Sequence, residues 1–110
     1  MIIPYETFEK IDMRSGTVVK VEAFPRARKP AFKIWVDFGE LGVKKTSAQV
    51  TARYTLESLL GKQVVGCVNL TPKNVAGFTS EFLLLGVADE DDAICLLSFD
   101  CSVPNGKRVM

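Results

Sequence analysis

The sequence contains no histidine, and this absence limits the chemistry that the chain can perform. Histidine is the most frequent general base near neutral pH and the commonest protein ligand of transition metals. Nucleophilic sites that pair serine or cysteine with histidine are therefore excluded. Neither of the glycine-rich phosphate-binding patterns, GxxxxGK[ST] and GxGxxG, occurs. We expect a protein that is not an enzyme and that holds no cofactor and no metal.

Cysteine is also scarce. The chain has three cysteines, Cys67, Cys95 and Cys101, and no CxxC pair. An odd number without such a pair predicts neither a disulfide framework nor a zinc site. This use of cysteine is typical of proteins in the reducing cytoplasm. The acidic run 89–92 lacks the ligand spacing of a calcium loop, so we interpret it as a solvated turn. Residues 1–6 carry no basic stretch and no long apolar run occurs, so we expect neither secretion nor membrane insertion.

No charge of one sign dominates, because 14 lysines and arginines stand against 13 aspartates and glutamates. A general polyanion binder is therefore not indicated, although a local basic face stays open because the surface field depends on where charges lie. The chain has 110 residues, of which 47% are apolar. These values are typical of one globular domain that covers residues 1–110.

Short strands separated by turns make up most of the chain. Residues 32–38 alternate between apolar and polar side chains, which predicts a strand with one buried face. Gly16 lies within a long predicted strand and indicates a bulge, and residues 71–80 are expected to form a loop. The predicted strands are 11–24, 32–38, 43–50, 63–70, 81–87 and 93–99, and the predicted helices are 4–10 and 51–60.

A lone helix between the third and fourth strands is typical of the five-stranded OB-fold Greek-key barrel. We therefore predict an all-β fold of this type. An SH3-like barrel and a small α+β sheet stay open as alternatives, but neither accounts as simply for a helix at that point.

Three stretches carry candidate binding residues. The loop 25–30 and Lys33 bring four cations close to Trp35, a combination that single-stranded nucleic-acid sites use. The alternative is a solvated loop with Trp35 partly packed. Lys44 and Lys45 point to opposite faces of a strand, so only one of them can face a groove. Both could equally protect an edge strand.

The third stretch, residues 69–81, joins two apolar strands and collects polar donors around a single cation. Asn69 ends a buried strand, so its amide needs a partner. Asn69 could either hold the loop in place or contact a ligand, and the sequence leaves both roles open. The candidate binding residues for polypeptide or tRNA are Arg14, Arg26, Arg28, Lys33, Trp35, Lys44, Asn69, Lys73, Asn74, Phe78, Ser80 and Glu81.

Several of these stretches together resemble one family. Residues 12–18, D-M-R-S-G-T-V, resemble the opening motif of the tRNA-binding domain family. Its later motifs follow in the same order as F-P-R-A at 24–27, V-D-F-G at 36–39, V-N-L-T-P-K at 68–73 and G-F-T-S-E at 77–81. Phe24 stands where histidine is usual in that family, and Phe82-Leu83 replaces its Gly-Met. The resemblance spans nearly the whole chain.

The segments S-A-Q at 47–49 and V-P-N-G-K at 103–107 are most similar to the export-related chaperones of this family. That resemblance implies an OB barrel whose N- and C-terminal extensions are used in dimerisation. It also implies a homodimer that binds unfolded or pre-secretory polypeptides in protein export and associates with the translocation motor SecA. Other relatives recognise tRNA by its shape, so structure-specific tRNA binding is the alternative function. Phe82-Leu83 and the single cation Lys73 suit an apolar ligand better.

Overall fold

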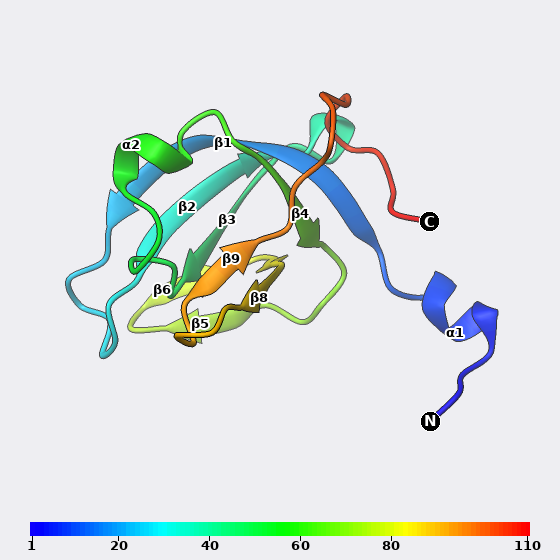
Figure 1. Ribbon diagram of the computed structural model, residues 1–110, viewed down its shortest axis with the longest axis horizontal. Helices are drawn as coiled ribbons and strands as arrows, with labels where there is room; N and C mark the ends of the chain where they lie inside the picture. The colour runs from blue at the N-terminus through cyan, green and yellow to red at the C-terminus, as the bar shows by residue number, and fades with distance from the viewer.

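Strand β1 (Met13–Ala23) is the centre of a five-stranded antiparallel sheet in the computed structural model, which describes residues 1–110. β1 continues into β2 (Phe32–Asp37) and β3 (Val43–Ala48), and the single turn η1 (Gly39–Leu41) joins those two. β4 (Gln63–Cys67) lies on the other side of β1. The order across the sheet is β3-β2-β1-β4-β7, and β7 is Leu83–Leu84. Figure 1 shows β1 running the length of the molecule.

Strand β1 pairs with a neighbour on each edge and contains one bulge. Its first half pairs with β4 and its second half with β2, and the register shifts between Val18 and Lys20. The bulge predicted at Gly16 is therefore wrong. Gly16 stays in register opposite Val64, and a Cβ there would lie 2.4 Å from Val36 Cγ1. Gly16 allows close packing under Val36, whereas the extra residue of the bulge is Val19.

The sheet curls until β3 meets the segment that leads into β7. The Glu81 N–H donates to the Lys45 carbonyl at 2.8 Å, and the Glu81 carboxylate accepts the Lys45 N–H at 2.9 Å. Thr46 Oγ1 donates to the Phe82 carbonyl at 2.8 Å. The result is a nearly closed five-stranded barrel. The prediction of an OB-type barrel is confirmed, whereas use of the chain ends in dimerisation stays a prediction.

The core lies inside this barrel. Ile34, Val36 and Phe38 are fully buried, as the alternation of residues 32–38 predicted. Phe38 packs edge-to-face on Phe82, with ring centroids 4.9 Å apart. The buried cluster consists of Val18, Ile34, Val36, Phe38, Val50, Leu59, Val64, Phe82, Leu84 and Leu96.

The internal helix is much shorter than predicted. Helix α2 covers only Leu56–Leu59, whereas the leucine spacing predicted residues 51–60. Thr55 starts the helix, because its side chain accepts the Ser58 N–H while Ser58 Oγ accepts the Thr55 N–H. Before that cap, the Tyr54 hydroxyl accepts the Leu96 N–H at 2.9 Å and holds the chain in a turn. Buried Leu59 still fixes α2 to the core.

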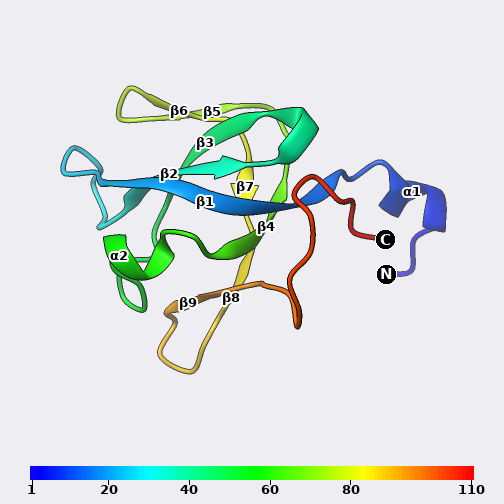
Figure 2. The ribbon, with the colours of Figure 1, turned by 90° about the horizontal axis from the view of Figure 1, so that it is seen from above.

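Two hairpins extend from opposite sides of the barrel (Figure 2). β5 (Lys73–Val75) and β6 (Phe78–Ser80) form the first, so the loop predicted over 71–80 is wrong. β8 (Gly86–Ala88) and β9 (Ile94–Leu96) form the second and flank the predicted acidic turn. The strand predicted over 81–87 is split into β7 and β8. The Leu85 N–H still donates to the Val65 carbonyl of β4, and the chain then turns away from β4 and pairs with β9.

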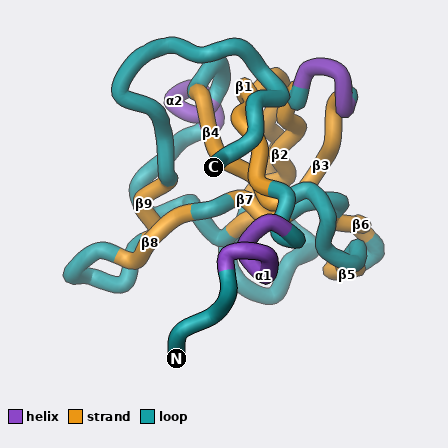
Figure 3. Tube along the Cα trace, turned by 90° about the vertical axis from the view of Figure 1, so that its right-hand side faces the viewer, coloured by secondary structure: helices purple, strands orange, loops and turns teal.

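The two ends of the chain meet on one side of the barrel. Helix α1 (Tyr5–Glu9) follows Pro4 and projects away from the sheet (Figure 1), so it lies in front of the barrel when the molecule is viewed from that side (Figure 3). The C-terminal segment runs along the first half of β1, where the Ser15 N–H donates to the Lys107 carbonyl at 2.9 Å and the Gly106 N–H to the Ser15 carbonyl at 2.7 Å. Neither helix is long and apolar enough to cross a membrane.

Candidate functional site

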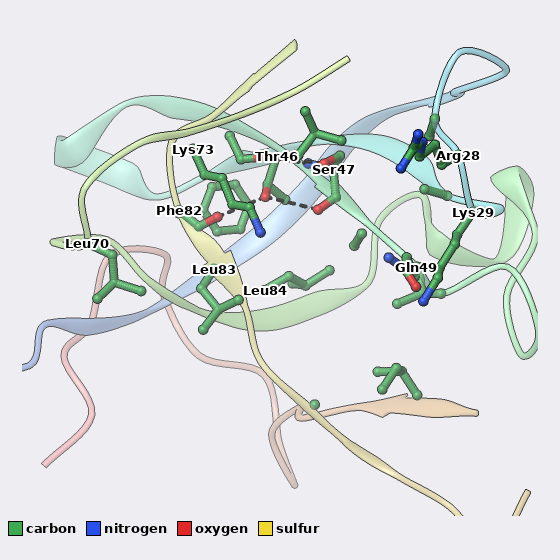
Figure 4. A pocket seen from close by; sticks show the side chains of 18 of the residues that line it. Arg28, Lys29, Thr46, Ser47, Gln49, Leu70, Lys73, Phe82, Leu83 and Leu84 are labelled. Atoms are coloured by element: carbon green, nitrogen blue, oxygen red, sulfur yellow. Dashed lines mark hydrogen bonds between the residues drawn. The ribbon is translucent and has the colours of Figure 1, made fainter. Parts of the chain in front are cut away.

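A groove of about 760 Å³ lies between β3 and β7, beside the point where Thr46 bridges the barrel. Residues 46–50 form one wall and residues 82–84 the other. Buried Val50, Phe82 and Leu84 provide an apolar floor. Exposed Leu70 and Leu83 border it, as Figure 4 shows. We call this surface the seam groove.

The seam groove is electropositive. Arg28 and Lys29 reach it from the loop between β1 and β2, and Lys73 reaches it from β5 (Figure 4). None of these three cations takes part in an ion pair within the chain. Asp92 is the one carboxylate among the lining residues. The groove therefore suits a ligand that combines apolar groups with negative charge.

An aromatic cluster covers the outer face of β2, next to the seam groove. Phe78 on β6 packs edge-to-face on Phe24 and Trp35, at centroid distances of 5.6 Å and 5.9 Å. Lys33 lies 5.0 Å from the centroids of Phe24 and Phe78, and Lys45 lies 4.9 Å from that of Phe78. Trp35 is half-buried, so it is partly packed.

Lys20 completes this aromatic–lysine cluster, with its ammonium 4.5 Å from the Trp35 ring centroid. Each contact is within the range in which an ammonium is attracted to the face of an aromatic ring. Lys33 and Lys45 have no carboxylate partner. Rings and cations together offer a surface that attracts phosphates and unpaired bases.

Three predicted site residues form hydrogen bonds within the chain, two of them across the seam and one within the first hairpin. Ser80 Oγ accepts the Ser47 N–H at 3.0 Å, and the Glu81 carboxylate accepts the Lys45 N–H. Asn74 Oδ1 accepts the Gly77 N–H at 3.1 Å and fixes the turn of the first hairpin. These bonds position the groove wall and the hairpin beside it. A direct contact between these residues and a ligand stays a prediction.

Arg14 and Asn69 lie away from the groove, on the side where the chain ends meet. Asn69 accepts the Asp12 N–H at 2.9 Å and donates to the Lys10 carbonyl at 2.6 Å, which is the holding role considered for it. Arg14 Nε donates to Asp12 Oδ1 at 2.6 Å. This hydrogen bond and the positive charges of Arg14 and Arg108 lower the pKa of the Asp12 carboxyl below its usual value.

The other two predicted cations also lie outside the groove lining. Lys44 pairs with Val36 in the β2–β3 register and so lies on the core side of β3, whereas Lys45 faces Phe78. Arg26 is exposed on the loop between β1 and β2. The structure thus brings Arg28, Lys73 and Ser80 together in the groove.

The candidate residues predicted from the sequence include neither Lys45 nor Lys20, although Lys45 was weighed there as the alternative to Lys44. A signal existed for Lys45, because the short turn over residues 39–42 pairs it with outward-facing Trp35. No comparable signal existed for Lys20. The bulge at Val19 decides which face of the sheet the Lys20 side chain lies on. The residue types around Val19 do not indicate a bulge.

Residues 13–108 match the family model described as a tRNA binding domain. The chain belongs to the tRNA-binding domain family. The chaperone CsaA from Bacillus anthracis is 45% identical, with all of both chains covered and a TM-score of 0.94. The CsaA chaperone protein from Picrophilus torridus is 38% identical over 99% of this chain and 100% of that one, with a TM-score of 0.92. The resemblance to the chaperone branch is confirmed.

Enzymes are matched through this domain alone. The methionine–tRNA ligase of Methanosarcina mazei is 33% identical over 108 residues, which are 98% of this chain but 15% of the ligase. The match therefore concerns a small part of that enzyme and carries over no catalytic activity.

Proposed function

We propose that this chain is a non-catalytic molecular chaperone that binds unfolded polypeptide in the seam groove. The observation that carries the proposal is the groove itself, in which an apolar floor is bordered by three cations without ion-pair partners. The similarity to CsaA over the full chain supports it.

Unfolded chains suit such a groove for a physical reason. Apolar side chains that a folded protein buries are exposed in an unfolded one, and each contributes about 1.5–3 kcal/mol when it leaves water completely. Arg28, Lys29 and Lys73 would attract acidic residues of the same segment. A folded client offers few such segments, so binding is selective for the unfolded state.

The cellular setting belongs to the same proposal. In it, the protein acts in the cytoplasm as a homodimer, receives pre-secretory polypeptides and passes them to SecA. Exposed apolar side chains near the N-terminus, among them Ile3, Tyr5 and Ile11, offer a surface that a second copy would cover. The chain has a mass of 12.1 kDa, and light scattering in solution should give twice that value.

An aggregation assay tests the chaperone proposal. The protein should slow the light scattering of a chemically denatured model protein, and Leu83→Asp should abolish that effect by placing a charge on the groove rim. Leu60→Asp is the matched control, because Leu60 is 57% exposed, comparable to Leu83 at 50%, but lies outside the groove lining. Equal aggregation with and without the protein contradicts the proposal.

A second function is favoured by the aromatic–lysine cluster. Trp35, Phe78, Lys33 and Lys45 combine rings with cations in the way that RNA-binding surfaces do. We propose tRNA binding on this face as the alternative. RNA binding should weaken steeply as salt increases, because it releases counterions, whereas apolar peptide binding should change little. A tRNA pool that binds no better than a scrambled RNA at physiological salt rules the alternative out.

A further inference from the structure

Strand β3 leaves part of its backbone unpaired along the seam groove. In an antiparallel strand, successive residues turn their N–H and C=O groups to opposite edges. Lys45 bonds to Glu81 through both groups, and the Ser47 N–H bonds to Ser80 Oγ. The backbone groups of Lys45 and Ser47 therefore point toward the seam, away from β2.

The Ser47 carbonyl points away from β2, which is the one strand that β3 pairs with, so no neighbouring strand donates to it. Its one contact is with Thr46 Oγ1 at 3.3 Å, but the same hydroxyl lies 2.8 Å from the Phe82 carbonyl. A hydroxyl has a single hydrogen, and the shorter bond takes it. The Ser47 carbonyl is thus an open acceptor on the wall of the groove.

The chain beyond Ser47 extends this open edge. Gln49 and Val50 line the groove, and the N–H of neither donates a hydrogen bond within the chain. On the facing wall, the Leu85 N–H bonds to Val65 of β4, so the preceding Leu84 turns its N–H and C=O toward the seam. β7 is only two residues long, and the edge of β3 is the longer template.

Side chains close the seam only at one end. Glu81, Ser80 and Thr46 satisfy the backbone there (Figure 4 shows the Thr46 and Ser47 bonds). Beyond the Ser47–Ser80 bond, no side chain bonds to the exposed backbone of β3. A row of unpaired backbone groups of this kind is a template for a further strand. An amphipathic helix in the groove would satisfy its own backbone and leave the Ser47 carbonyl unpaired.

We infer that the seam groove binds its polypeptide in extended conformation, as a strand added to the edge of β3 beyond Ser47. This inference rests on the proposed chaperone function and specifies how the ligand is held. Side chains on one face of the added strand would pack on Val50 and Leu84. Those on the other face would meet Arg28, Lys29 and Lys73, so the preferred segment alternates apolar with acidic residues.

A scan with N-methylated peptides tests this binding mode. The probe is a capped peptide of about eight residues in which valine alternates with glutamate, long enough for one strand. It is titrated into the full-length protein by calorimetry. Methylation of one amide at a time removes one donor and blocks one edge of the peptide. We expect alternate positions to lose at least about tenfold in affinity, and the positions between them to stay close to the parent peptide.

The outcomes separate this inference from the proposed function. If neither this peptide nor denatured protein binds, the chaperone proposal fails. If the parent peptide binds but methylation has no effect, or lowers affinity equally at every position, strand addition is wrong and side-chain contacts alone hold the ligand. A lysine-for-glutamate version should bind more weakly, and equal binding would remove the role of the three cations. Release of a second copy of the chain by the peptide would identify that copy as the occupant.

Discussion

The two sides of the barrel treat polar groups in opposite ways. Where the chain ends meet, Asp12, Arg14, Asn69 and Arg108 form what we call the terminal hub, in which each side chain bonds to a partner in the chain. In the seam groove, backbone groups and cations lack such partners. Both sides contain arginine and other polar side chains, so the presence of polar groups alone does not distinguish a structural site from a binding site. The difference lies in whether the bonding capacity is already used.

Removing Asn69 should break the terminal hub and have the largest effect. Asn69→Ala leaves the Asp12 N–H and the Lys10 carbonyl without their partner and should lower the free energy of unfolding by about 1–2 kcal/mol. Urea denaturation measures this loss, and peptide binding at neutral pH should not change. Asn74→Ala, which removes one exposed bond in the first hairpin, is the control. Equal losses in the two variants would mean that the hub has no special role in stability.

A matched pair of arginine substitutions sharpens the contrast. Arg14→Gln breaks an ion pair whose arginine side chain is 25% exposed, and it should cost about 1 kcal/mol of stability. Arg28→Gln removes a cation without a partner, so stability should stay within about 0.5 kcal/mol while affinity for acidic peptide falls. Thermal unfolding and peptide titration report the two effects. The comparison would be overturned if Arg28→Gln lowered stability and Arg14→Gln lowered peptide affinity.

Acid should weaken the terminal hub. The hydrogen bond and charge of Arg14 lower the pKa of Asp12. The stability from this group is therefore complete above the carboxyl's usual pKa in the unfolded chain, and it is lost as pH falls through the lower folded value. Asp12→Asn should make the decline in urea midpoint below about pH 4 shallower. Asp89, whose pKa is lowered chiefly by the Asp91 N–H, accounts for a remaining decline. An unchanged slope in Asp12→Asn would contradict this account.

The smallest effect is expected at the turn of the first hairpin. Ala76 has φ of +49°, a left-handed conformation that costs an L-residue about 1–2 kcal/mol. Asn tolerates this conformation and forms the favoured Asn-Gly turn with Gly77, so Ala76→Asn should stabilise the protein by about 0.5 kcal/mol. Hydrogen exchange of the β5 and β6 amides should slow. Ala52→Asn, at an exposed residue without positive φ, is the control and should bring no gain.

Patterns with a short period were read correctly from the sequence. The alternation of residues 32–38 identified the buried side of β2, because a strand has a period of two and its core is apolar. The first hairpin was missed because each of its strands has three residues and its turn begins with alanine, which is not a turn former. Short elements of this kind depend on tertiary contacts, here the packing of Phe78 on Phe24 and Trp35.

The site could be predicted only in part for the same reason. Arg28, Lys33 and Lys73 were identified as cations near a binding surface, and the structure places them in the groove or the neighbouring cluster. Arg14 lies outside the groove and pairs with Asp12, which is two residues away on the same face of an extended chain. That spacing predicts an ion pair. A cation should therefore be checked for a nearby carboxylate in the sequence before it is assigned to a ligand-binding site.

The C-terminal segment along β1 has a consequence for how the barrel forms. Ser15 is bonded to Lys107, a residue 92 positions further along the chain. The barrel therefore combines local meander contacts with one pairing that spans almost the whole sequence, and pairings of that range slow folding because a large loop must close first. During synthesis, the first half of β1 cannot pair with the C-terminal segment until the ribosome has added residues 104–109. A barrel of this design therefore passes through an incomplete state in which one strand edge is exposed.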